Sequence, residues 1–470
     1  MSDIRPIILT GIVLIVPLWL IVKKNEDLLV KWICLTVAVD IFDPHLVVNL
    51  AGARVAGLLL LPSSLAALSA VRSSKAGNAL WRYLIYLGCM GVVFGFIFPW
   101  SSEGFDRLPT QLSQVRAVVY FCRKAADFSV AVFLARYLWN TRRPDRLIGW
   151  FVGCTGIAAA GGILQWLTDV DFYALLTGAN QLHLEDRMRG FNYEPRGLGL
   201  IVGQGLILAF VLYARDRSWR RLFLVLLHAV AMFVAVSTSG LFVVGAGILA
   251  LFIVDATTRK VLFAPAVLIL FLCTAVLVTS VAGNFVQSWL YNVSLRLSGD
   301  KEGSAPESDV EDFALKQDVF DASAIMLFAS RPELLLTGVG PGLGGLASTD
   351  YLPIAALFDW VNEEGAGLNS VPQVGLLREA CDVGIVGLFL GWMFVSASGA
   401  ALRRLSRGIG SEAARWDIAR AAFWIAVSIY LVQASPLSAS FSLFLAMGLT
   451  ATWISSPSLP VLSATAEATA

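Results

Sequence analysis

The stretch Arg187-Met-Arg-Gly-Phe-Asn-Tyr-Glu-Pro-Arg-Gly-Leu-Gly199 is a polar passage between two long apolar segments. Its dipeptide Glu194-Pro195 predicts the start of a helix, because proline suits the first helical turn and an acid there suits the helix dipole. A guanidinium group binds a carboxylate or a phosphate through two parallel hydrogen bonds. The passage therefore indicates an anionic ligand, or internal ion pairing, at a membrane boundary. It carries three arginines, Arg187, Arg189 and Arg196.

The composition is typical of an integral membrane protein. Of the 470 residues, 57% are hydrophobic and 15% are charged, whereas about 25% of the residues in a soluble protein are charged. Apolar runs of about 20 residues recur along the chain, each able to cross a hydrocarbon layer roughly 30 Å thick. These features predict an all-α, polytopic membrane protein. A net charge of +1 argues against a nucleic-acid partner, which requires a concentrated basic surface.

The apolar runs predict about 12 or 13 transmembrane helices. No pair among the cysteines has the spacing of zinc ligands, so we expect neither a structural metal nor a disulfide. The candidate spans are 7–22, 27–42, 52–71, 77–99, 116–139, 147–167, 195–214, 222–237, 240–255, 261–283, 374–399, 418–435 and 438–455.

Short basic loops set the expected orientation, because arginine and lysine are enriched on the cytoplasmic side. Four such loops agree in parity, namely 140–146, 215–221, 258–260 and 403–407. They place three loops on the outer face, namely 101–115, 168–194 and 284–373. The side of the amino end stays open. An odd number of spans, favoured by Lys23-Lys24, places it outside, and an even number, favoured by Arg5, places it inside.

The segment 284–373 is predicted to be a large acidic loop outside the spans. Apolar residues at helical spacing predict an amphipathic surface helix over 310–329, which Arg331-Pro332 ends. A glycine-rich turn follows at Gly338–Gly345 and lacks the Lys-Ser/Thr of a phosphate loop. The expected divisions are an N-terminal bundle at 1–283 with the outer loop 168–194, the acidic segment at 284–373, further spans at 374–455 and a polar tail at 456–470.

Three local motifs occur along the chain. Arg189-Gly-Phe-Asn-Tyr-Glu-Pro195 leads into an apolar span, and Val236-Ser-Thr-Ser-Gly240 separates two short spans. The third motif has two parts, Ser330-Arg-Pro-Glu-Leu-Leu-Leu-Thr-Gly-Val-Gly-Pro-Gly342 and Leu368-Asn-Ser-Val-Pro-Gln-Val-Gly-Leu-Leu-Arg-Glu-Ala-Cys-Asp-Val-Gly-Ile-Val-Gly387. In the order and spacing of these motifs, the chain resembles the bacterial O-antigen polymerase and O-antigen ligase superfamily, and within it the exopolysaccharide repeat-unit polymerases.

Two departures separate the chain from the ligases of this superfamily. In the ligases a histidine typically precedes the asparagine of the third motif, whereas Gly367-Leu368 precedes Asn369 here. The serine-rich turn at 236–240 also lacks the arginine that many ligase relatives carry. These differences favour a polymerase. An O-antigen ligase or a protein O-oligosaccharyltransferase stays an alternative.

The resemblance implies a GT-C-like helical bundle in the bacterial inner membrane, with its active site on the periplasmic side. It implies an inverting glycosyl transfer that uses no metal and no cofactor. The donor would be a growing glycan on undecaprenyl pyrophosphate, and the acceptor a newly flipped lipid-linked repeat unit. A flippase, a chain-length regulator and export proteins of the same pathway would be partners. Such a transfer needs cations for the departing pyrophosphate, a base for the acceptor hydroxyl and an apolar groove for the lipid.

Five residues are candidates for catalysis, namely Arg187, Arg189, Glu194, Arg378 and Glu379. The two arginines of the outer loop suit pyrophosphate, although they could instead neutralise nearby acids. Glu194 could act as the base or merely as a helix cap. Arg378 and Glu379 lie near the start of an apolar span, where a charge is costly unless it is paired or faces a cavity.

Five further residues are candidates for substrate binding, namely Arg196, Asn369, Arg331, His183 and Arg123. Arg196 could enter a wet cavity or pair with an acid, and Asn369 could bond a sugar or cap a turn. Arg331 could bind phosphate, although a cation also suits the end of its helix. His183 could serve as a base because an imidazole titrates near neutral pH.

Arg123 belongs to a charged stripe on one predicted span, together with Arg116, Lys124 and Asp127. These residues could line the same cavity as the other candidates. Because Arg123 and Asp127 are four residues apart on a helix, they could equally form a self-contained pair.

A transporter is an alternative function of another class. A flippase or sugar transporter would spread its intramembrane charges over both halves of the chain and often shows inverted repeats. Here the ionisable residues gather towards the expected outer boundary, which favours the enzyme. An inactive scaffold in a synthesis complex stays a further alternative.

Overall fold

The computed structural model describes residues 4–42, 52–67, 74–99, 113–178, 188–235, 237–254, 318–348, 374–432 and 438–455. Within these ranges every regular element is helical. Five helical segments are long and apolar enough to cross a membrane, as in a helical membrane protein. They are Arg5–Val22, Lys75–Ile97, Pro144–Thr168, Pro195–Asp216 and Gly375–Ser406.

The helices are α1 (Arg5–Val22), α2 (Glu26–Ala38), η1 (Asp40–Phe42), α3 (Gly52–Ala66), α5 (Lys75–Val92), η3 (Val93–Ile97), α6 (Ser113–Thr141), α7 (Pro144–Thr168), α8 (Phe172–Thr177), α9 (Pro195–Asp216), α10 (Trp219–Ala235), α11 (Thr238–Val254), α15 (Asp318–Ser330), α16 (Leu334–Thr337), α17 (Gly344–Ser348), α19 (Gly375–Ser406), α20 (Ser411–Val432) and α21 (Ser438–Ile454). In its described part, each expected span overlaps one or two of these helices, except 261–283, which lies outside the described residues. α6 and α20 are long, but they carry several charged side chains and are not among these five segments.

Local sequence sets where several helices begin. Pro144 and Pro195 occupy the first turns of α7 and α9, where proline's missing N–H is not needed. The predicted helix start at Glu194-Pro195 is therefore confirmed. The break predicted at the serine-rich turn is also confirmed, because α10 ends and α11 begins there. Ser237 Oγ accepts a hydrogen bond from the Gly240 N–H at 3.2 Å across this break.

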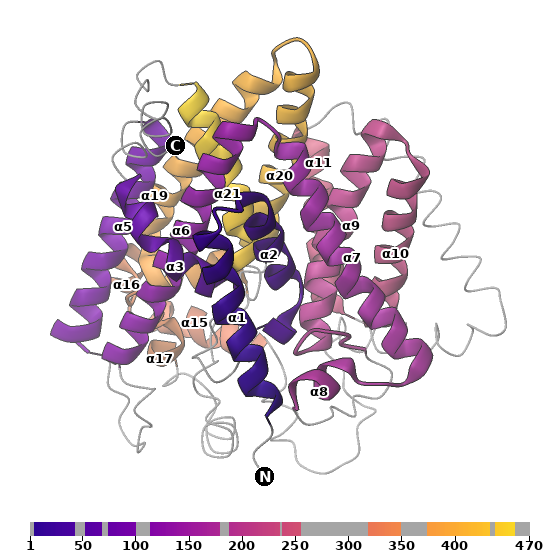
Figure 1. The fold of residues 1–470 in the computed structure, drawn as a ribbon. Coiled ribbons are helices and arrows are strands. Elements are labelled where there is room, and N and C mark those ends of the chain that lie inside the picture. The colour runs from indigo at the N-terminus through magenta and orange to yellow at the C-terminus, as the bar shows by residue number, and fades with distance from the viewer. Residues whose placement is uncertain are drawn as a thin grey trace.

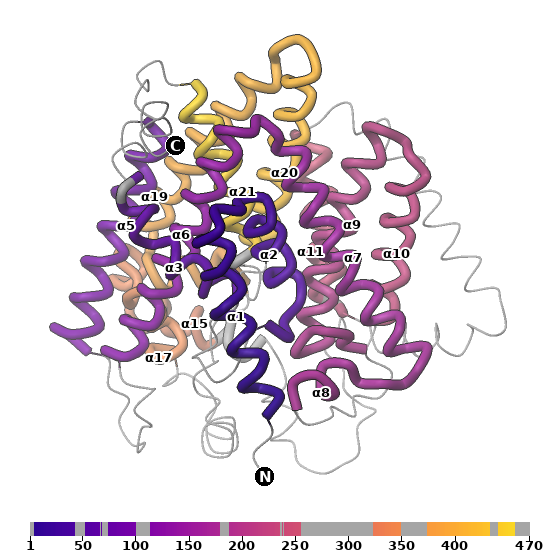
Figure 2. Tube along the Cα trace, in the orientation of Figure 1, coloured from indigo at the N-terminus to yellow at the C-terminus, as the bar shows by residue number. Residues whose placement is uncertain are grey.

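The helices form two groups that share α20. α9 packs against α7, α10 and α11. In its most apolar stretch of 18 residues, 83% of the residues are buried, compared with 17% in the corresponding stretch of α1. In the second group α6 packs against α3 and α21, and α19 packs against α5 and α20. α20 also contacts α7, α9 and α11, and so joins the two groups. Figures 1 and 2 show the two groups side by side, with α9 among its neighbours.

The described basic turns gather at one end of the bundle. Three basic turns, 140–146, 215–221 and 403–407, lie at the end drawn uppermost in Figure 1. α8 and the start of α1 lie at the opposite end, where Arg5 Nη1 donates to the Leu175 carbonyl oxygen at 2.7 Å. The three turns therefore share one face, as the sequence predicts, and the amino end lies on the other face. The fourth basic loop, 258–260, lies outside the described residues.

A small separate core joins α15, α16 and α17. Its buried residues are Leu327, Leu334, Val339, Leu343, Leu346 and Ala347. α15 ends at Ser330, directly before Arg331-Pro332, as predicted. Its outward face exposes Ile325 and Met326 at 58% and 55%. Over this half of the helix the outer face is therefore apolar, unlike the polar face of the predicted amphipathic helix. Residues 310–317 lie outside the described part of the chain.

α19 is broken at Gly384, which has φ 61° and ψ −172°. The glycine-rich turn that follows α16 bonds to the residues just before this break. The N–H groups of Val339 and Gly340 donate to the carbonyl oxygens of Cys381 and Asp382 at 2.7 and 3.2 Å. The turn therefore supplies hydrogen bonds to the backbone carbonyl groups just before the break. The sequence predicted a continuous apolar helix here, without a break.

Replacing Gly384 with alanine should destabilise the protein by roughly 1–3 kcal/mol, because only glycine adopts this backbone conformation without strain. A Cβ would also lie 2.4 Å from the Leu336 carbonyl oxygen. Denaturation of the purified protein in detergent measures the change. Gly391→Ala is the matched control on the same helix, since the nearest atom to its Cβ is 3.9 Å away. Equal stability of the two variants would contradict the break.

Candidate functional site

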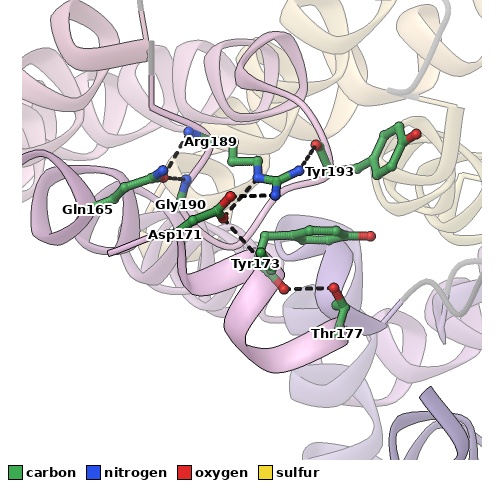
Figure 3. A network of polar contacts seen from close by, with 8 residues as sticks. Gln165, Asp171, Tyr173, Thr177, Arg189, Gly190 and Tyr193 are labelled. Atoms are coloured by element: carbon green, nitrogen blue, oxygen red, sulfur yellow. Dashed lines mark hydrogen bonds and ion pairs between the residues drawn. The ribbon is translucent and has the colours of Figure 1, made fainter. Parts of the chain in front are cut away.

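Arg189 is the centre of a polar network near α8 (Figure 3). Its Nε and Nη2 donate to the two carboxylate oxygens of Asp171 at 2.9 and 2.5 Å, and its Nη1 donates to the Tyr193 carbonyl oxygen at 3.1 Å. The guanidinium carbon lies 4.8 Å from the centre of the Tyr173 ring. Only 2% of Arg189 is exposed. All three guanidinium nitrogens therefore bond inside the protein.

Gln165, near the end of α7, supports the same turn of the chain. Its Oε1 accepts from the backbone N–H groups of Arg189 and Gly190 at 3.0 and 2.6 Å. Asp171 also caps α8 by accepting from the Ala174 N–H at 3.1 Å. The network ties the end of α7, the start of α8 and the approach to α9 into one unit. Its geometry favours a structural brace over a direct contact between Arg189 and pyrophosphate.

The other candidates from the opening stretch are arranged differently. Glu194 is the residue before α9; its side chain is exposed and makes no capping bond. Arg196 is half-buried in the first turn of α9. His183 and Arg187 lie outside the described residues. The described part of the stretch therefore favours internal ion pairing, one of the two possibilities that the sequence left open.

A second buried cluster surrounds Glu379 in the first part of α19. The Tyr83 hydroxyl on α5 donates to Oε2 at 3.1 Å, and the Tyr430 hydroxyl on α20 donates to Oε1. Lys124 on α6 places its Nζ 3.6 Å from Oε1. Two hydroxyl donors and a neighbouring ammonium group suit an ionised carboxylate, which can only accept hydrogen bonds. Four helices therefore converge on one acidic side chain, whose exposed fraction is 10%.

The Glu379 cluster lines a cavity between α5, α6, α19, α20 and α21. Its volume is about 360 Å³, within the range of roughly 300–1,000 Å³ that is usual for ligand pockets. Apolar side chains form most of the wall, and Glu379, Lys124 and both tyrosine residues supply polar groups. The apolar lining includes Leu84, Phe128, Trp392, Phe441 and Leu445. The cavity therefore offers apolar surface beside a carboxylate held by donors.

Asp127 also lines this cavity. Its ion-pair partner is Arg54, not Arg123 as considered from the sequence. Arg54 on α3 donates through Nε and Nη2 to the two carboxylate oxygens of Asp127 at 3.0 and 3.2 Å. Arg123, four residues earlier on α6, is therefore not the partner of this carboxylate. A bidentate ion pair forms only where the planar guanidinium faces both carboxylate oxygens. The packing of α3 on α6 places Arg54 in this position.

Asp382 follows Glu379 by one helical turn and is 2% exposed. Its Oδ1 accepts from the backbone N–H groups of Gly342 and Gly344 at 3.1 and 3.3 Å. Asp382 therefore occupies the N–H groups that a phosphate would need in the glycine-rich turn. Arg378 is half-buried and close enough to act electrostatically on both carboxylates. Asn369 lies outside the described residues.

Arg331 lies after the end of α15 and is largely exposed. Its Nε donates to Glu333 Oε1 at 3.2 Å. The backbone N–H of Glu333 and this guanidinium hold the pKa of the Glu333 carboxyl below its usual value. The position favours the simpler of the two roles considered, a cation at the end of a helix.

The two clusters share no helix, so those catalytic candidates that the structure describes do not form one group. The roles of Tyr83, Tyr430, Asp382 and Arg54 were not inferred from sequence. Arg54 and Asp382 lie within expected spans, and a charge in a span marks a candidate position. The two tyrosine residues give no such signal, because tyrosine is common near membrane interfaces.

Replacing Arg189 with alanine should lower the free energy of unfolding by roughly 3–5 kcal/mol, because it leaves a buried carboxylate without its cation. Denaturation in mixed detergent micelles measures this change. Arg331→Ala removes a pair whose side chains are 48% and 63% exposed and should stay close to wild type. Wild-type stability of the Arg189 variant, together with lost activity, would instead indicate a substrate contact.

The chain matches no model of a known protein family, and a search of curated proteins finds no significant relative.

Proposed function

We propose that the protein polymerises lipid-linked oligosaccharide repeat units into a bacterial surface polysaccharide or exopolysaccharide. The observation that carries this proposal is the position of Glu379. It is a buried carboxylate, held by two tyrosine hydroxyls and a lysine, at the wall of a largely apolar cavity. A glycan carried on a lipid needs this combination, because its chain requires apolar surface and its acceptor hydroxyl requires a proton acceptor.

In the proposed reaction, the acceptor oxygen bonds to the anomeric carbon of the donor glycan with inversion. The bond from that carbon to the pyrophosphate breaks, and its electron pair leaves with undecaprenyl pyrophosphate. Glu379 takes the proton of the acceptor hydroxyl. The departing pyrophosphate needs positive charge on the opposite face of the sugar from Glu379, and Arg378 is the candidate for that role. The lipid pyrophosphate is already activated, so the transfer draws on no nucleotide.

The sequence and the charged ends of the bundle support the same proposal. Glu379 and the glycine-rich turn both belong to the third motif, on which the resemblance to repeat-unit polymerases partly rests. Basic turns suit the cytoplasm. With the three basic turns there, α8, α15 and the start of α19 face the periplasm of the bacterial inner membrane, where lipid-linked repeat units arrive. The amino end is then outside, as an odd number of spans requires.

Replacing Glu379 with glutamine should lower chain extension by about 100-fold or more, because the proton acceptor is lost while the side-chain shape is kept. Purified protein in nanodiscs is given a lipid-linked repeat unit as sole substrate, and the products are resolved by gel. The wild type should give a ladder of lengthening glycans. Glu333→Gln, an exposed site outside the cavity, should leave the ladder intact.

Two outcomes would contradict the proposal. An unchanged ladder from a folded Glu379→Gln protein would remove this carboxylate from the reaction. A wild type that makes no ladder, but transfers the glycan to lipid A or to an added protein, would identify a ligase. Elution of each variant as a single species on gel filtration controls for unfolding.

A further inference from the structure

The two carboxylate oxygens of Glu379 are held unequally. Oε1 accepts from the Tyr430 hydroxyl and lies 3.6 Å from Lys124 Nζ. Oε2 accepts from the Tyr83 hydroxyl at 3.1 Å. Each carboxylate oxygen has two lone pairs. Among the described residues, Oε2 therefore keeps the larger capacity to accept a further hydrogen.

Lys124 reaches this carboxylate from α6. Its side chain is 23% exposed and lines the cavity, and its Nζ lies 5.2 Å from the centre of the Tyr120 ring. An ammonium in such a place is costly unless it is paired. Asp127, one turn further along α6, accepts bidentate hydrogen bonds from the guanidinium of Arg54. Glu379 is therefore the carboxylate with which Lys124 forms its ion pair.

We propose that Lys124 is a positioning residue for the reaction. With Tyr430, it holds Oε1 and so fixes the plane of the Glu379 carboxylate with Oε2 turned to the acceptor hydroxyl. This inference rests on the proposed function, in which Glu379 is the base. It assigns to Lys124 no contact with the substrate.

The expected defect follows from the chemical step. The acceptor O–H bond breaks and its proton moves to Oε2, while the acceptor oxygen bonds to the anomeric carbon and the pyrophosphate leaves with the electron pair of the broken bond. Without Lys124, the carboxylate keeps the hydrogen bonds from Tyr430 and Tyr83 but loses the ion pair at Oε1, and its plane can turn away from the acceptor hydroxyl. The loss falls on the rate of transfer, because the apolar lining that holds the lipid is unchanged.

The test measures chain extension by the full-length protein in nanodiscs with a synthetic lipid-linked repeat unit. Lys124→Met should lower kcat by at least about 10-fold and leave KM within about 2-fold of wild type. Lys124→Arg should recover most of the rate because it keeps the cation. Lys31→Met is the matched control. This lysine on α2 lies over the Trp150 ring at 5.2 Å, and its loss should leave both constants unchanged.

Two double-mutant comparisons separate positioning from a merely structural role. In the residual activity of Glu379→Gln, Lys124→Met should cause no further loss, because both changes act through one carboxylate. Equal losses in both backgrounds, a change confined to KM, or failure of arginine to restore the rate would overturn the inference. The second cycle compares the thermal midpoints of the wild type, the two single variants and the double variant. Additive shifts in the midpoint would show that Lys124 and Glu379 do not form a stabilising ion pair.

The failure of the proposed function is distinguishable from the failure of this inference. A folded wild type that makes no polymer refutes the proposed function and, with it, a role for Lys124 in transfer. The thermal cycle does not depend on activity, and non-additive shifts would still support Lys124 as the residue that holds Glu379.

Discussion

Within a bilayer no water is available to a backbone N–H or C=O group, so each must be bonded inside the protein. The break at Gly384 meets this constraint through the glycine-rich turn, which bonds to the backbone just before it. The Tyr86 hydroxyl also lies 3.0 and 3.1 Å from the carbonyl oxygens of Thr337 and Val383. Asp382 completes the junction through its side chain. The break and the turn depend on each other, and the setting of Glu379 depends on both.

The two buried charged clusters differ in the capacity they leave for a ligand. All three guanidinium nitrogens of Arg189 donate hydrogen bonds to Asp171 or to the Tyr193 carbonyl oxygen, and the side chain is buried. Glu379 is also buried, but it lies on a cavity wall. Burial and charge therefore do not by themselves distinguish a brace from a reactive site. The distinction comes from whether bonding is complete and from what space adjoins the group.

Local sequence predicted most of the helix positions. Pro195 begins α9, the serine-rich turn separates α10 from α11, and Arg331-Pro332 follows the end of α15. These signals act over a few residues, because they depend on backbone geometry and capping. The break in α19 was not predicted, because Gly384 lies within an otherwise apolar run and its conformation depends on a partner segment.

The candidate site was less accessible to sequence reasoning. Glu379 was identified because a charge in an apolar span is costly, but its partners lie far away in the chain, Tyr83 by 296 residues. The partner of Arg189 is only 18 residues distant, yet a turn of the chain decides that it is Asp171. Such pairings depend on how the helices pack, so they cannot be read from the residues adjacent in sequence.

The burial of α9 has a consequence for how the protein is assembled. Every residue from Gly197 to Leu212 is buried, and Gly199 packs so closely on Ser237 that a Cβ would lie 2.2 Å from the serine Cβ. The helix is nevertheless apolar enough to be stable in lipid by itself. Helices of this kind can insert first and associate afterwards. Because α10, α11 and α20 follow α9 in the chain, the surface of α9 that they bury is the last part of this helix to gain its protein neighbours during synthesis.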